Sequence, residues 1–243
     1  MSRTPPTQPN EERRRRDFED LATHFDEHFS RLLAAPDWWP GPASKTGQAL
    51  ARVRTLGAAS RAVDDEAWLS AAYGALLRWQ AFRGVRGGIP EDRFRAGMEG
   101  LGDLVAPVES RTISTIPRAG IAQLFDLFAA VAPLKPTRSK WVVASKTLYH
   151  LLPDLVVPMD RLVTARFLRL SALPEGLDQR FFREFYEDVA RVARSVGGAH
   201  LEVLSRANPH ASDDRIRIGQ ARVIDFAMAG AVKGRAPDGA GSD

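Results

Sequence analysis

Cysteine is absent from this chain of 243 residues, and so is any long apolar run. Without cysteine the chain cannot form disulfide bonds or thiolate metal sites, which suits a reducing cytoplasm. The apolar stretches are too short to span a bilayer, and residues 1–16 lack the apolar core of a secretory signal. We therefore expect a cytoplasmic protein that makes no contact with membranes.

The alternation of apolar and polar residues that marks β-strands is also missing. Apolar residues recur instead at steps of three and four, as in Phe18, Leu21, Phe25, Phe29 and Leu32. This spacing predicts an all-α fold, a compact bundle of eight to ten helices. The helices are expected over residues 11–35, 45–60, 64–82, 90–105, 118–131 and 138–152, from 160 onward, from about 181 to 197, and over 214–231.

The two ends of the chain have a different composition from the middle. Residues 1–10 are rich in proline and polar side chains, and residues 233–243 resemble a linker. Such segments cannot bury enough apolar surface to fold, so both are expected to be disordered tails. Residues 11–232 are expected to form a single helical domain, in which the loop near 84–90 is the best candidate for a division into lobes.

Acidic residues are scarce in one part of the chain. From Lys135 to Leu170, seven lysines and arginines accompany only Asp154 and Asp160, although the net charge of the whole chain is only +4. A positive surplus on one pair of helices indicates contact with phosphate groups. The alternative interpretation is an arginine bias that reflects only the base composition of the gene.

This basic region contains two helices joined by a short apolar linker. Pro153 ends the first helix, and Pro158 forces the residue before it into an extended conformation. Lys146, Tyr149 and His150 share one face of the first helix, because positions three and four apart are neighbours on a helix. This face adjoins the one that Trp141, Ala144 and Leu148 turn toward the core.

Asp160, at the start of the second helix, has two interpretations. As an N-cap it accepts hydrogen bonds from backbone N–H groups of its own helix. As a catalytic carboxylate it deprotonates a water molecule or stabilises developing positive charge. Lys146 is either a solvated lysine or, with a lowered pKa, a nucleophile or a phosphate contact. His150 is either a hydrogen-bonded, partly buried histidine or a proton shuttle.

The segments ASKTLYHLLPDLVVPMDR and ARVIDFAMAG resemble bacterial helical proteins related to the helix-hairpin-helix DNA glycosylase superfamily. In that superfamily a lysine and an aspartate at the starts of two helices frame the scissile glycosidic bond. The resemblance implies a glycosylase-like fold, with Lys146 and Asp160 as catalytic residues. It also implies extrusion of a modified base from DNA, with Tyr149 or a tryptophan stacking on the base.

The partner that this interpretation predicts is double-stranded DNA. The residues expected to bind it are Arg138, Lys140, Tyr149, His150, Arg161 and Arg166. A non-enzymatic module that binds a protein partner is the alternative, and an enzyme acting on small nucleosides is a third hypothesis. We expect no cofactor and no metal, because His24 and His28 lie one turn apart without an evident third ligand.

Overall fold

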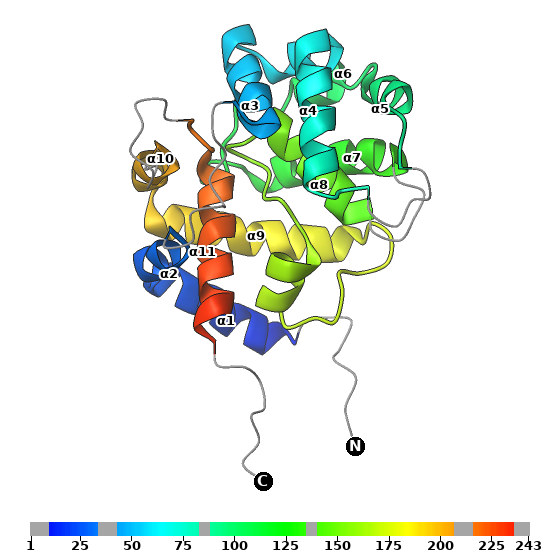
Figure 1. Cartoon of the computed structure of the whole chain (residues 1–243). Helices are drawn as coiled ribbons and strands as arrows, with labels where there is room; N and C mark the ends of the chain where they lie inside the picture. Colours follow the sequence, from blue (N-terminus) through cyan, green and yellow to red (C-terminus); the bar gives the residue numbers. More distant parts are fainter. Residues whose placement is uncertain (1–9, 34–42, 83–87, 135–139, 207–215, 236–243) are drawn as a thin grey trace.

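The computed structural model describes residues 10–33, 43–82, 88–134, 140–206 and 216–235, and in these ranges it contains helices but no strands (Figure 1). The all-α prediction is therefore confirmed. The described ranges hold ten α-helices of eight or more residues: α1 Glu11–Thr23, α2 Phe25–Leu33, α3 Lys45–Leu56, α4 Glu66–Arg78, α5 Glu91–Met98, α7 Arg118–Val131, α8 Lys140–Leu151, α9 Gln179–Val196, α10 Gly198–Arg206 and α11 Gln220–Gly234.

Shorter helical elements join them: the 3₁₀ helices η2 (Ala59–Asp64) and η3 (Ala132–Leu134), the four-residue α6 (Gly102–Val105) and the π-helix η4 (Arg161–Ala165). Capping side chains fix where several helices begin. Ser44 caps α3, Asp65 caps α4 and Asp178 caps α9, each accepting a hydrogen bond from the backbone N–H three residues later.

Several predicted elements differ from the observed ones. The single helix expected over 11–35 is two helices, because the backbone leaves the helical conformation at His24. Helix α10 was not predicted at all. The helix expected after Asp160 is one π-helical turn with little beyond it. In this turn the N–H of Ala165 donates to the carbonyl of Asp160, five residues earlier, at 3.0 Å. The helical segment ends at Arg169, which has a φ of 56°.

The expected tails and lobe division lie mostly outside the described residues. Within the described part, Lys233 and Gly234 belong to the end of α11 rather than to a tail. Buried apolar side chains from α1 through α11 form one continuous cluster. None of the described helices combines the length and the apolar composition that a bilayer span needs.

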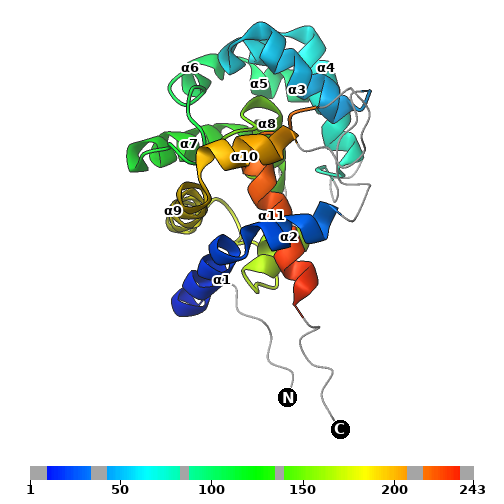
Figure 2. The same cartoon turned by 90° about the vertical axis from the view of Figure 1, so that its left-hand side faces the viewer.

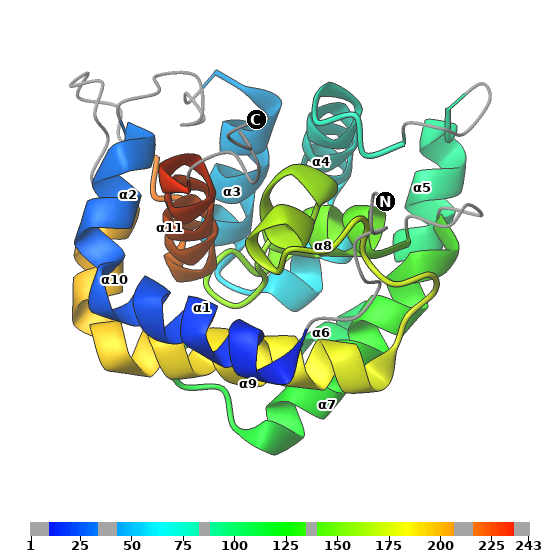
Figure 3. The same cartoon turned by 90° about the horizontal axis from the view of Figure 1, so that it is seen from below.

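Helix α8 occupies a central place in this arrangement. It contacts α3 and α4 on one side and α7 on another, while α1 and α9 run alongside each other below it (Figure 3). Helices α2 and α11 pack against each other over many residues, and Figure 2 shows them crossing at close range. The end of α4, α8 and α11 meet at the ring of Trp79, which lies within 5.6 Å of the Lys146 amine of α8 and 5.0 Å of the Arg222 guanidinium of α11.

Candidate functional site

Lys146 and Asp160 lie next to each other. The Lys146 Nζ is 3.7 Å from Asp160 Oδ2, and their side chains are 12% and 28% exposed. Asp160 Oδ1 caps η4 by accepting the Val163 N–H at 2.8 Å, and the Asp160 N–H donates to Thr164 Oγ1. One carboxylate oxygen therefore stabilises the helix start, and the other faces the amine.

The linker between the two helices produces this proximity. Residues 155–159 are buried and apolar, so the chain passes through the core instead of around it. At its end the Met159 N–H donates to the Ser145 hydroxyl at 2.8 Å. Because Ser145 precedes Lys146 and Met159 precedes Asp160, this single hydrogen bond holds the two charged residues side by side.

The C-terminal end of α4 also contacts the Lys146 amine. The Lys146 Nζ lies 3.4 Å from the carbonyl oxygen of Trp79 and 5.6 Å from the centre of the Trp79 ring. Trp79 is the C-cap of α4, where carbonyl groups carry partial negative charge. Burial lowers the pKa of Lys146, while the Asp160 carboxylate opposes that shift.

Helix α11 contributes a second, deeper carboxylate. Asp225 is 2% exposed and accepts a hydrogen bond from Arg222 Nη1. Burial raises the pKa of Asp225 to about 7; the Arg222 guanidinium opposes this shift and the Asp160 carboxylate adds to it. The Arg222 guanidinium also lies over the rings of Trp79 and Tyr149, at 5.0 Å and 5.7 Å from their centres.

Tyr149 and His150 are fully buried, which differs from the surface position that direct binding of DNA requires. The Tyr149 hydroxyl donates to the carbonyl of Ile218 at 3.1 Å, and its ring stacks on Trp79. His150 Nδ1 lies 2.6 Å from the Lys146 carbonyl and Nε2 lies 3.3 Å from Thr46 Oγ1. Burial lowers the pKa of His150 to about 4, so the ring is neutral near pH 7.

The predicted basic contacts are spread over two elements. Lys140 is the first residue of α8 and is half-buried, whereas Arg161 and Arg166 are exposed on and just after η4. Arg138 lies outside the described residues. The exposed cations therefore belong to the same short segment whose first residue is the Asp160 cap.

Sequence reasoning missed Trp79, Arg222 and Asp225 as members of the site. Asp225 carried a usable signal, since it is the only charged residue between 223 and 232. A lone carboxylate in an apolar helix is either paired or functional, because burying it unpaired is costly. Trp79 and Arg222 had no comparable signal, because nothing in the sequence shows that the end of α4 meets α11.

Replacing Asp225 by asparagine is expected to change how stability depends on pH. The pKa of this carboxyl is about 7 in the folded protein and 3.8 in the unfolded chain. Between these two pH values, folding therefore takes up a proton. Such a group lowers the free energy of unfolding as pH rises through this window. Relative to the parent, Asp225→Asn should therefore gain stability with rising pH, by up to about 1.4 kcal/mol per pH unit.

Urea unfolding of both proteins between about pH 4 and pH 8 measures this difference. His150 titrates with the opposite sign, since its lowered pKa makes the fold gain stability as pH rises from about 4 toward 6.5. It is present in both proteins, so its contribution cancels in the comparison. Parallel stability curves would show that Asp225 is ionised throughout the window.

The described residues contain no group of three or more histidine, aspartate or glutamate side chains placed to hold a metal ion. His28 instead contacts the Asp20 carboxylate at 3.1 Å. Lys146 also lies in the middle of α8 rather than at the start of a helix, unlike the lysine of the helix-hairpin-helix glycosylases. Comparisons of the chain with protein-family models, curated proteins and solved structures gave no match, so the glycosylase resemblance has no support from them.

Proposed function

We propose that this protein binds double-stranded DNA and that the Lys146–Asp160 pair acts on the N-glycosidic bond of a modified base. The observation that carries the proposal is the 3.7 Å separation of an amine and a carboxylate at a partly exposed position. Exposed Arg161 and Arg166 on the adjoining segment supply positive charge for phosphate groups.

The proposed reaction is hydrolysis. Asp160 Oδ2 removes a proton from water as the water oxygen bonds to the sugar C1′ and the bond from C1′ to the base breaks. The Lys146 ammonium, whose pKa burial lowers, gives its proton to the departing base nitrogen. The proton on Asp160 then passes to the neutral Lys146 amine beside it, which restores both groups. Water is consumed, and the products are the free base and an abasic sugar.

The aromatic side chain proposed to stack on the extruded base is Trp79. Its ring is half-buried and is already held by Tyr149 and Arg222, so ordering it costs little on binding. Tyr149 lies behind it in the core and acts as a support. In this role Asp225, through Arg222, positions the ring.

DNA binding is expected to depend on the charges of Lys140 and Arg166. A double variant, Lys140→Glu with Arg166→Glu, should bind a short labelled duplex at least about tenfold more weakly than the parent at low salt. Fluorescence anisotropy at about 50 mM and 200 mM salt measures both the affinity and its salt dependence. The matched control is the double variant Arg93→Glu with Arg194→Glu, two exposed arginines of α5 and α9 outside the basic region. If the parent does not bind the duplex at low salt, the DNA proposal fails.

The competing proposal is a helical module that holds a protein partner. The specific observation in its favour is Leu162, an apolar side chain that is 62% exposed between Arg161 and the buried Val163 on η4. On this proposal the Lys146–Asp160 pair serves only to fix η4. Absence of both DNA binding and base release, together with normal folding, favours this module over the enzyme.

A further inference from the structure

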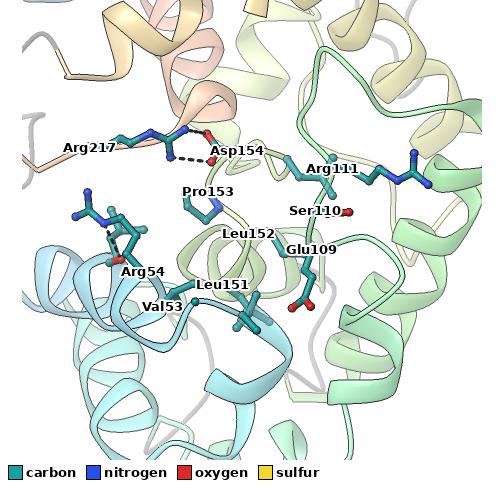
Figure 4. A pocket seen from close by; sticks show the side chains of 15 residues that line it. Val53, Arg54, Glu109, Ser110, Arg111, Leu151, Leu152, Pro153, Asp154 and Arg217 are labelled. Carbon is teal, nitrogen blue, oxygen red and sulfur yellow. Dashed lines mark hydrogen bonds and ion pairs between the residues drawn. The ribbon is translucent and has the colours of Figure 1, made fainter.

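A pocket of about 360 Å³ lies between the ends of α3 and α8, apart from the Lys146–Asp160 pair (Figure 4). Its lining joins residues from four separate parts of the chain. The lining includes the apolar side chains of Val53, Leu152 and Pro153 and three arginines. In Figure 4, Arg54 and Arg217 lie on one side of the pocket and Arg111 lies on the other. An apolar concavity of this size with a few charged groups at its edge is typical of a small-molecule site.

The acidic side chains near the pocket are already engaged. Arg217 donates to both oxygens of Asp154, at 2.7 Å and 2.6 Å, and also to Glu202. Asp154 accepts a further hydrogen bond from the Gln220 N–H. The Glu109 carboxylate accepts the Ser60 N–H at 2.7 Å. The charge of Asp154 is therefore balanced by Arg217, whereas Glu109 keeps its negative charge. With Arg54, Arg111 and Arg217 against Asp154 and Glu109, the lining still carries a net charge of +1.

The positive charge of Arg54 is not paired with a carboxylate in this way. Its Nε donates only to the carbonyl of Leu50, at 3.3 Å within its own helix, and no carboxylate among the described residues forms an ion pair with it. Arg111 likewise has no ion pair within the described part of the chain. The pKa of Arg54 is lowered by burial and then by the neighbouring Arg217 guanidinium, while the Asp154 carboxylate opposes this shift. Arg54 is thus a partly buried cation without a carboxylate partner among the described residues, and a bound anion supplies that partner.

We propose that this pocket binds a small organic anion, a carboxylate or a phosphate ester with an apolar body. The anionic end accepts hydrogen bonds from Arg54, which has no carboxylate partner among the described residues. The apolar body covers Val53, Leu152 and Pro153. Arg111 adds only longer-range positive charge, because its exposed guanidinium points away from the other labelled residues in Figure 4.

Direct binding of model anions tests the proposal without DNA. Titration calorimetry of the full chain should detect phenyl phosphate and benzoate, with inorganic phosphate weaker and benzyl alcohol undetected, because both the charge and the apolar body contribute. Arg54→Gln should weaken phenyl phosphate binding at least about tenfold, the loss of one charge-assisted contact. Arg111→Gln should have a smaller effect.

Arg61→Gln is the matched control, since Arg61 is an exposed arginine of the nearby η2 that does not line the pocket. It should bind phenyl phosphate like the parent. Thermal melting of each variant establishes that it folds. The proposal is overturned if the parent binds none of the anions at millimolar concentration. Equal losses in Arg54→Gln and Arg61→Gln would also overturn it, because they would reflect net charge alone.

Discussion

Asp160→Asn should lose base release from a damaged duplex by about 10²–10⁴-fold while folding normally. Asparagine keeps the cap, because its side-chain oxygen accepts the Val163 N–H as aspartate does. It removes only the basic oxygen that faces Lys146. The measurement is single-turnover release from duplexes that each carry one deaminated, oxidised or alkylated base, read as alkali-labile strand breaks.

The cap and the catalytic role can be separated with Asp178→Asn. Asp178 caps α9 in the same way, accepting the Phe181 N–H at 2.8 Å, but its carboxylate has no lysine beside it within the described residues. Both variants should change the free energy of unfolding by about 1 kcal/mol or less. Only Asp160→Asn should lose turnover. If the two variants have equal turnover, Asp160 serves only as a helix cap and the catalytic assignment is wrong.

Gly230→Ala should destabilise the fold by about 3 kcal/mol or more, the largest stability change that we predict for a single added methyl group. A Cβ at residue 230 would lie 1.8 Å from the carbonyl oxygen of His28. Backbone of α2 would have to move away from α11, and these two helices share the most extensive contact in the described structure. Chemical denaturation of the parent and the variant measures the loss.

Gly74→Ala is the control for helix propensity. Gly74 is also an interior helix glycine, and its added Cβ would meet only the flexible side chain of Lys45, at 3.0 Å. Alanine favours a helix over glycine by up to about 1 kcal/mol, so Gly74→Ala should be neutral or stabilising. A tolerated Gly230→Ala would mean that α2 and α11 are not packed backbone to backbone.

Local patterns in the sequence were enough to identify most helices. The predicted helix over 118–131 coincides with α7, because its apolar residues recur at steps of three and four and Pro117 precedes it. No such pattern predicted the break at His24 or the presence of helix α10. The turn after Asp160 was expected to be an ordinary helix and is a π-helix, since the carbonyl of Asp160 accepts the N–H of Ala165, five residues later.

The residues of the candidate site also differ in whether the sequence alone could predict their positions. By itself the sequence determined that a short apolar linker bounded by two prolines separates Lys146 from Asp160. The hydrogen bond between Met159 and Ser145, which the tertiary structure supplies, then places the two charged residues side by side. Only the tertiary structure decided that Trp79 and Asp225 join them and that Tyr149 and His150 lie inside the core. Helical periodicity tells which side chains are neighbours on one helix. It cannot tell how deeply that face is covered, because the covering comes from α3, α4 and α11, which lie far away in the chain.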